Sequence, residues 1–304
     1  MPLSEWRKKS TTVPSNPHTA VMVVGHGTTS LEGISQFEQI VDQLRKCLEV
    51  PVGHGFIELA EPDIATGFSR LLASNDISEV VVLPLLLLAA GHAKNDVPSS
   101  ISAARKRYPR VSFSYAKDLS VTPTLLEIVE DRTLTPFEVV PQATLPPFQA
   151  GFTLLVGRGS TDPDANSDLY KIARLLTERG ELGLVEPAFI SLAKPSVAEA
   201  LDRLRLLGAR NVTVSPYFLF TGSLLERIYV QSRSWARQNP DITLRLAKEM
   251  GPDQRIVDLL IQRVGETDSP VPVMNCDMCI YRAEIPGHEH KVGQPHSFTD
   301  LHQH

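Results

Sequence analysis

The chain carries one pattern of residues twice, and this repeat constrains the fold more than any other feature. In each copy a β-rich apolar run leads into a Gly-X-Gly turn, with His26 at the centre of the first turn and Arg158 at the centre of the second. Two further blocks recur in the same order and at a nearly constant offset. The paired blocks are residues 20–28 and 152–160, 56–62 and 189–195, and 79–88 and 211–220. Three matching blocks in order predict a duplicated domain.

Within each copy, short apolar runs alternate with segments of helical periodicity. In the first copy the expected strands are residues 20–24, 52–59, 79–88 and 111–115, and the expected helices are residues 37–48, 64–72, 97–108 and 123–132. This alternation predicts an α/β fold of two tandem doubly wound domains, each with a mostly parallel four-stranded sheet flanked by helices. The expected limits are 18–134 for the first domain, 135–150 for a proline-rich linker, 151–265 for the second domain and 266–304 for an irregular tail.

Charge and composition exclude several classes of protein. The formal net charge of -5 argues against a nucleic-acid-binding protein, which is usually basic. No apolar run approaches the ~18 residues that a membrane span needs. The first 16 residues are polar and do not resemble a secretory signal. Because three cysteines in 304 residues are not a disulfide framework, we expect a cytoplasmic protein.

The candidate site lies at the carboxyl ends of the strands in the first copy, where open α/β sheets bind ligands. His26 follows the first strand, Glu58 lies at the end of the second, and His92 follows the third. Side chains from neighbouring strands ~4.8 Å apart can converge. Two imidazoles and a carboxylate suit Co(II), Fe(II), Ni(II) or Zn(II), and they leave coordination positions open.

Each of these residues also has a simpler interpretation. A single histidine at a strand end is more often structural than a ligand, and Glu58 could be a surface carboxylate. A dinucleotide-binding loop is a weak alternative, because Ser30 stands where the third glycine of that motif is required. The repeat provides an internal control, since the second copy keeps the apolar frame but lacks all three candidates. The residues at or near those positions are Arg158, Ser191 and Ser223. This pattern favours one working site and one that has lost its ligands.

Three motifs together resemble a known family. They are Val-Gly-His-Gly at residues 24–27, Phe-Ile-Glu-Leu-Ala-Glu-Pro at 56–62, and the stretch from Leu83 to Pro98 that contains Gly-His-Ala-Lys-Asn-Asp-Val-Pro. The chain resembles the sirohydrochlorin chelatases of the CbiX/SirB type over residues 19–265, and its tail resembles that of the long CbiX forms. The resemblance implies a class II chelatase, which uses no ATP and inserts Co(II) or Fe(II) into sirohydrochlorin for cobalamin or siroheme. The family's metal-handling residues match His26, Glu58 and His92.

The resemblance also sets an expectation for the chemistry. His26 and His92 would hold the metal beside the macrocycle and accept pyrrole protons, while Glu58 would orient an imidazole or neutralise the metal's charge. Glu61 is the alternative to Glu58, or else a first-turn acid of the following helix. The flat anionic substrate is expected in a cleft between the two domains. Its carboxylates would bind basic residues, unless these are ordinary surface charges; the candidates are Arg158, Lys94 and Arg227.

The tail carries a Cys-x-x-Cys motif, Cys276 and Cys279, followed by several histidines. The pair could hold a structural zinc together with His288 and His290, or could act as a redox dithiol. The resemblance to long CbiX proteins implies an iron-sulfur cluster instead. Such a cluster needs about four cysteines, so a cluster bridging a dimer or one with incomplete ligation would be required. The histidine-rich end would store metal or have no role, and Cys47 is expected in the core.

Several functions remain open at this stage. Cobalt is favoured over iron because of the histidine-rich tail and the long form. A cobalt or nickel chaperone without catalysis is one rival, and a scaffold that binds a tetrapyrrole and passes it on is another. The expected partner is sirohydrochlorin, with no nucleic acid and no membrane, and the chain would be a monomer or a homodimer.

Overall fold

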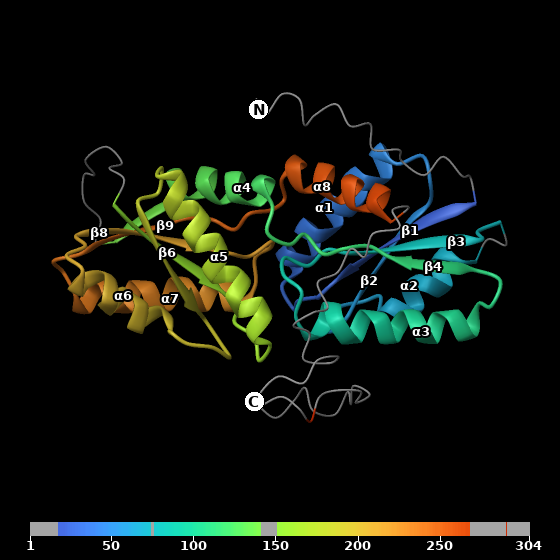
Figure 1. Ribbon diagram of the computed structural model, residues 1–304, viewed down its shortest axis with the longest axis horizontal. Coiled ribbons are helices and arrows are strands. Elements are labelled where there is room, and N and C mark those ends of the chain that lie inside the picture. Colours follow the sequence, from blue (N-terminus) through green and yellow to red (C-terminus); the bar gives the residue numbers. More distant parts are fainter. Residues whose placement is uncertain (1–17, 74–75, 141–150, 268–289, 291–304) are drawn as a thin grey trace. The chain divides into compact units, whose positions relative to one another are not determined.

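The computed structural model describes residues 18–73, 76–140, 151–267 and 290. The chain forms two compact units (Figure 1). The described residues of the first unit are 18–27, 38–73, 76–119, 257–267 and 290, and those of the second are 28–37, 120–140 and 151–256. Within these described residues no helix is both long and apolar enough to cross a membrane.

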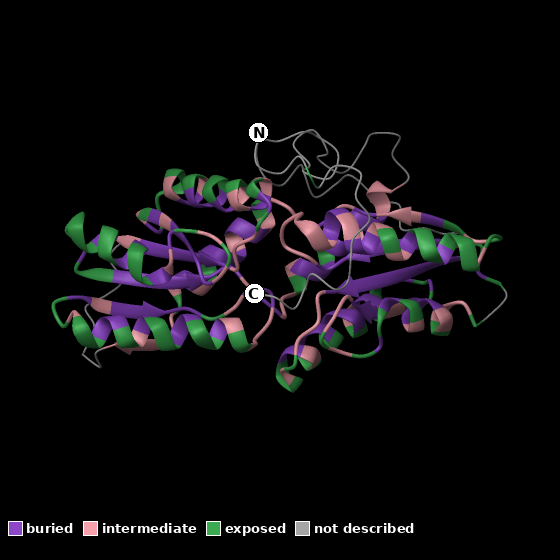
Figure 2. Cartoon of the chain, turned by 90° about the horizontal axis from the view of Figure 1, so that it is seen from below, coloured by how far each residue is buried: buried purple, intermediate pink, exposed green. Residues whose placement is uncertain are grey.

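The first unit contains a four-stranded parallel sheet in the order β2-β1-β3-β4. Its strands are β1 (Thr19–Gly25), β2 (Val52–Phe56), β3 (Glu79–Pro84) and β4 (Ser112–Tyr115). The central strand β1 is buried along its whole length (Figure 2), as expected for an apolar run covered on both faces. One face packs against α2 (Ile64–Leu71) and α3 (Val97–Arg107), with Met22 and Phe68 among the buried contacts. A π-helical turn, η2 (His92–Asp96), precedes α3.

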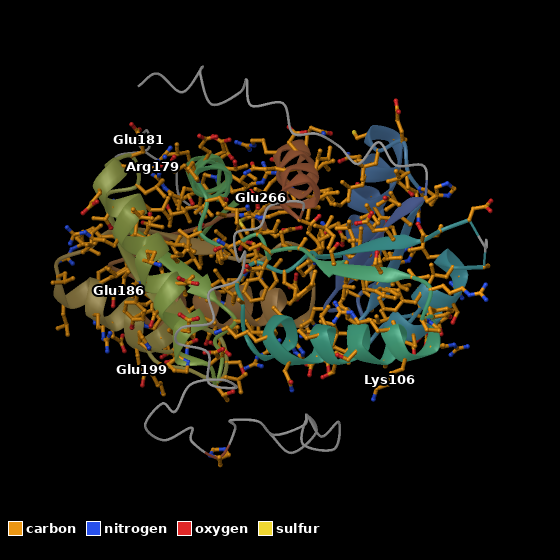
Figure 3. The ribbon with its side chains drawn as sticks, turned by 45° about the vertical axis from the view of Figure 1, so that its right-hand side comes forward. Lys106, Arg179, Glu181, Glu186, Glu199 and Glu266 are labelled. Carbon is orange, nitrogen blue, oxygen red and sulfur yellow. The ribbon has the colours of Figure 1, made fainter. Side chains whose placement is uncertain are left out.

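The second unit repeats this plan and adds one strand. Its sheet has the order β5-β9-β8-β6-β7, and β6 (Phe152–Gly157), β7 (Leu184–Phe189), β8 (Asn211–Pro216) and β9 (Thr243–Leu246) are parallel. Helices α5 (Pro163–Arg179), α6 (Val197–Leu206) and α7 (Ser223–Gln238) connect these strands. Charged side chains such as Lys106 of α3 and Glu199 of α6 lie on the outer faces of helices (Figure 3). The predicted α/β fold with two sheets flanked by helices is confirmed.

Three helices do not follow the repeat in their packing. Helix α4 (Pro123–Leu134) follows β4 in the sequence but belongs to the second unit, where Thr133 Oγ1 donates to Ser215 Oγ over 2.8 Å. Helix α8 (Gln254–Glu266) follows β9, yet its Arg263 donates to the carbonyls of Asp118 and Leu119 in the first unit. Helix α1 (Leu31–Cys47) contributes residues to both units. The compact units therefore differ from the two repeats at these helices.

The segment expected to be a linker, residues 135–150, is partly structured. Residues Glu138–Val140 form β5, which pairs antiparallel with β9. Arg233 fixes this edge strand by donating from Nε to Glu138 over 2.8 Å, and the contact lowers the pKa of that carboxyl group. The prediction of a linker was therefore wrong for these three residues, because a cross-strand ladder and an ion pair stabilise them. Residues 141–150 lie outside the described part of the chain.

Candidate metal centre

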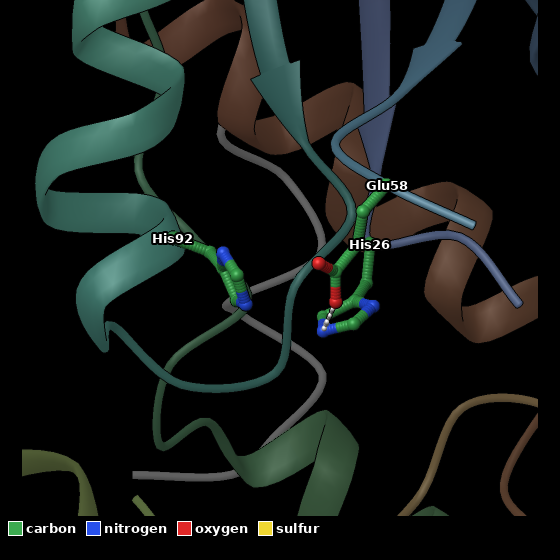
Figure 4. A group of neighbouring side chains, drawn as sticks. All are labelled: His26, Glu58 and His92. Carbon is green, nitrogen blue, oxygen red and sulfur yellow. Dashed lines mark ion pairs between the residues drawn. The ribbon is translucent and has the colours of Figure 1, made fainter. Parts of the chain in front are cut away.

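Three strand ends of the first unit bring His26, Glu58 and His92 together (Figure 4). His26 directly follows β1, Glu58 lies two residues beyond β2, and His92 opens η2 after β3. Because β1 lies between β2 and β3 in the sheet, the three loops emerge side by side at its carboxyl edge. One ligand atom from each residue lies within 4.8 Å of the other two. Among the described residues, this is the one such group of three or more histidine, cysteine or acidic side chains.

Backbone hydrogen bonds carry the sheet register into the site. The amide of Ile57 donates to the carbonyl of Gly25 over 2.9 Å, and the amide of Glu58 donates to that of His26 over 3.0 Å. This close approach requires the glycine that follows His26. Gly27 has a φ of 95°, and a Cβ atom at this position would lie 1.7 Å from the carbonyl oxygen of Glu58. The Gly-His-Gly motif therefore sets the distance between the first and second ligand.

A hydrogen bond at Nδ1 of His26 leaves the other ring nitrogen, Nε2, available to bind a cation. Its Nδ1 lies 3.1 Å from the carbonyl oxygen of Gly27, and this contact is a hydrogen bond only if Nδ1 carries the proton. In the neutral ring Nε2 then bears a lone pair, and it faces Glu58 Oε1 at 3.4 Å. Two acceptor atoms that face each other repel unless a cation, either a proton or a metal ion, lies between them. The side chains of His26 and Glu58 are 28% and 24% exposed, so this position is open to solvent.

His92 is oriented by a buried carboxylate that the sequence interpretation did not identify. Its Nδ1 lies 2.6 Å from Oδ2 of Asp96, whose side chain is 5% exposed. A proton on Nδ1 leaves the lone pair on Nε2, which is the arrangement that metal-binding histidines adopt when a carboxylate supports them. The His92 ring lies edge-on to that of His26, with the centroids 4.6 Å apart. The spacing of four residues between His92 and Asp96 was the available signal.

The π-helical turn that holds His92 is itself fixed by a neighbouring strand. Tyr115 of β4 donates from its hydroxyl to the carbonyl of Ala93 over 2.8 Å. Burial, together with the carboxylates of Asp118 and Asp96, raises the pKa of Tyr115, so this phenol stays protonated as a donor. Turns of this kind are frequent at functional sites.

A cavity of about 400 Å³ lies at the loop that carries Glu58. Its lining residues are Phe56, Ile57, Glu58, Leu59, Ala60, Glu61 and Asp63. Glu61, the alternative to Glu58, is exposed, and its carboxylate accepts a hydrogen bond from the amide of Asp63 in its own loop. It does not belong to the converging group of ligand atoms.

The basic residues expected to bind substrate occupy different environments. Lys94 lies within η2 and is 2% exposed, so it is a buried cation and not a solvated surface charge. Arg158 and Arg227 belong to the second unit and contact the same loop after β7. The carbonyl of Arg158 accepts from the amide of Ser191, and the Arg227 guanidinium donates to the carbonyl of Ile190 over 3.3 Å.

The second unit keeps the loop geometry of the first at the equivalent place. Gly159 has a φ of 86°, and a Cβ atom there would lie 1.9 Å from the carbonyl of Ser191. Arg158 and Ser191 replace His26 and Glu58 on this frame. The backbone of the site is thus duplicated, while the ligand set occurs in the first unit.

The tail motif falls outside the described residues, which include neither Cys276 nor Cys279. The same holds for His288, whereas His290 is described and exposed. Cys47 is exposed at the end of α1, so the expectation of a core position was wrong. It is the last residue of α1, so its exposure reflects its position at the end of the helix.

The comparisons with known proteins agree with this geometry. The model of the CbiX family matches residues 20–135 and 153–267. Sirohydrochlorin cobaltochelatase from Priestia megaterium is 34% identical over 88% of this chain and 86% of its own length. Sirohydrochlorin ferrochelatase from Bacillus subtilis is 31% identical over 82% of this chain and 91% of its own length.

A solved structure, SirB from Bacillus subtilis with Fe3+, superposes with a TM-score of 0.69. It is 30% identical in sequence, and the match covers 82% of this chain and 95% of that one. The expected resemblance to the CbiX/SirB chelatases is confirmed over both repeats. The family model, the two-unit fold and the relatives lead to one conclusion: this chain belongs to the CbiX family.

Proposed function

We propose that this protein inserts a divalent metal ion into sirohydrochlorin, with Co(II) as its metal substrate. The observation that carries the proposal is the convergence of His26, Glu58 and His92 at one sheet edge, in a chain whose relatives are named sirohydrochlorin cobaltochelatase and ferrochelatase. Cobalt is favoured because a cobaltochelatase matches 88% of this chain.

The three side chains bind the incoming metal first. His26 and His92 each offer Nε2, and Glu58 offers a carboxylate oxygen, so the protein fills three positions at most. The remaining positions stay available for water and then for pyrrole nitrogens, as a transfer site requires. Asp96 supports this step by keeping the Nδ1 proton of His92 in a hydrogen bond, which leaves Nε2 free to coordinate.

Metal insertion also requires the removal of two pyrrole protons. A neutral imidazole accepts a proton near neutral pH once its metal has moved to the ring. Glu58 lies 3.4 Å from His26 Nε2 and stabilises the imidazolium that results. In this scheme each ligand that gives up the metal becomes a base for a departing pyrrole proton.

Basic residues of the second unit bind the substrate's carboxylates. Arg158 and Arg227 are the first candidates, because both contact the Ile190–Ser191 loop that replaces the ligand-bearing loop of the first unit. Lys94 is assigned a smaller part, since its 2% exposure leaves little of the ammonium accessible.

The test is the initial rate of metal insertion under anaerobic conditions, followed by the change in tetrapyrrole absorbance. Co(II) and Fe(II) are compared with the full chain and with a chain that ends at Thr267. We expect turnover with both chains and a higher rate with Co(II). Tight metal binding without turnover would instead favour a cobalt or nickel chaperone, and tight binding of the ring without metallation would favour a scaffold.

Iron is the second candidate for the metal substrate, in a siroheme role. Imidazole and carboxylate ligands accept Fe(II) as well as Co(II). Ferrochelatases from Priestia megaterium and Bacillus subtilis match 69% and 82% of this chain at 34% and 31% identity. A faster initial rate with Fe(II) than with Co(II) would assign the chain to this role.

Two further parts of the proposal concern the Cys-x-x-Cys motif of the tail and the cellular compartment. Cys276 and Cys279 supply two thiolates, fewer than the roughly four that an iron-sulfur cluster needs, so a cluster would bridge a homodimer. The test is the visible absorbance of anaerobically purified protein and its sedimentation. We expect the Cys276→Ser variant to lose both the absorbance and the dimer. A monomer without that absorbance would leave zinc or no ligand at the pair. The cytoplasm is the compartment we propose.

A further inference from the structure

Each unit exposes one leucine whose backbone lies in the left-handed region. Leu59 has a φ of 63° and is 56% exposed, and Leu192 has a φ of 59° and is 51% exposed. They occupy equivalent positions of the repeat, in the loops after β2 and β7. The left-handed region is strained for a branched side chain, and glycine or asparagine adopts it more readily. Both positions thus combine a strained backbone with an apolar side chain in water.

The loop holds each leucine in this exposed position. In the first unit the amide of Phe56 donates to the carbonyl of Pro62 over 2.9 Å, and Phe56 forms an isolated bridge with Asp63. In the second unit Phe189 makes the same two contacts, to Pro195 and Ser196. The base of each loop is therefore closed, and the leucine lies in the short segment between the paired ends.

The repeat separates the role of this leucine from that of the metal ligands. Between the two loops Glu58 changes to Ser191 and Glu61 changes to Lys194, but the leucine between them is kept. A copy without the ligand set has no use for a residue that serves the metal. Strain that persists in two copies indicates a functional contact, and an exposed leucine offers only an apolar one.

The neighbours of Leu59 indicate what it contacts. It directly follows Glu58 and lines the cavity of about 400 Å³ at this loop. A ligand that enters this cavity therefore reaches the part of the loop that carries both Glu58 and Leu59. We propose that Leu59 is an apolar contact for the face of the tetrapyrrole ring. This inference rests on the proposed function, since sirohydrochlorin combines a flat apolar ring with carboxylates at its periphery.

The experiment compares near-isosteric substitutions in the full chain. Leu59→Asn removes the apolar surface but accepts the left-handed backbone, so this variant should fold. Leu59→Met keeps an apolar side chain, and Leu206→Asn is the matched control at an 88% exposed leucine on α6. Equilibrium binding of metal-free sirohydrochlorin is followed by absorbance, and Co(II) alone is titrated separately.

We expect Leu59→Asn to raise the Kd for sirohydrochlorin about fivefold or more, the loss that burial of half a leucine side chain implies. Leu59→Met and Leu206→Asn should stay within about twofold of wild type on the same scale. The Kd for Co(II) should not change in any of them. Wild-type ring affinity in Leu59→Asn, with an active wild-type enzyme, overturns this inference alone. Failure of the wild-type enzyme to bind or metallate sirohydrochlorin overturns the proposed function and this inference with it.

Discussion

Removal of the Asp96 carboxylate should weaken metal binding without changing any ligand. Asp96 Oδ2 accepts the Nδ1 proton of His92 over 2.6 Å, and its side chain is 5% exposed, so water cannot easily replace it. Loss of a carboxylate that supports a metal-binding histidine costs about 10–100-fold in metal affinity. That range corresponds to about 1.4–2.7 kcal/mol of binding free energy.

Two substitutions at Asp96 distinguish its role in orienting the His92 ring from its role in filling space. Asp96→Ala leaves the Nδ1 proton of His92 without its acceptor. Asp96→Asn keeps the shape, but its amide can donate to Nδ1, which moves the ring proton to Nε2 and removes the lone pair that binds metal. We therefore expect the asparagine variant to lose at least as much Co(II) affinity as the alanine variant, despite its closer fit.

The assay is a titration with Co(II) alone, by calorimetry and by visible absorbance of the bound ion. Thermal unfolding of each variant shows whether the fold survives. Asp162→Asn is the matched control, because Asp162 is also buried but caps α5 in the second unit. Wild-type Co(II) affinity in Asp96→Asn would refute the assigned role of this carboxylate, as would an equal loss in the Asp162 control.

Three further predictions concern the loops, the pH response and the substrate. Gly27→Ala should destabilise the fold by at least about 1 kcal/mol more than Gly180→Ala, because both residues have positive φ but only the Gly27 Cβ meets a backbone atom; denaturant unfolding measures this, and equal losses would contradict it. Burial and Arg45 lower the pKa of His54 below its usual 6.5, so stability should fall as pH drops below that value, and His54→Gln should flatten this slope in unfolding curves; an unchanged slope would refute the assignment. Arg158→Ala should raise KM for sirohydrochlorin more than it lowers kcat, and a pure kcat loss would contradict its binding role.

Much of the fold could be predicted because the repeat and the apolar periods are local signals. The buried run of β1 and the helical spacing of α1 follow directly from the residue pattern. The partner of α4 could not be predicted in this way. Its sequence predicts a helix after β4, whereas its place in the second unit depends on contacts such as Thr133 with Ser215, which lies far along the chain.

The candidate site could likewise be predicted only in part from the sequence. Strand ends placed His26, Glu58 and His92 at one edge, and the structure brings them together. The support of His92 by Asp96 was missed, because a helix of ordinary periodicity was expected to begin only at Val97. The π-helical turn before that helix also buries Lys94, which periodicity alone could not predict.

The central claim is that His26 and His92 insert metal into sirohydrochlorin. Its most direct test is the anaerobic rate of Co(II) insertion for His26→Ala, His92→Ala and His54→Ala, with His54 as a half-buried histidine of the same unit outside the site. The account predicts a loss of at least about a hundredfold for the first two variants and a nearly wild-type rate for the third. Nearly wild-type insertion by both His26→Ala and His92→Ala would contradict it.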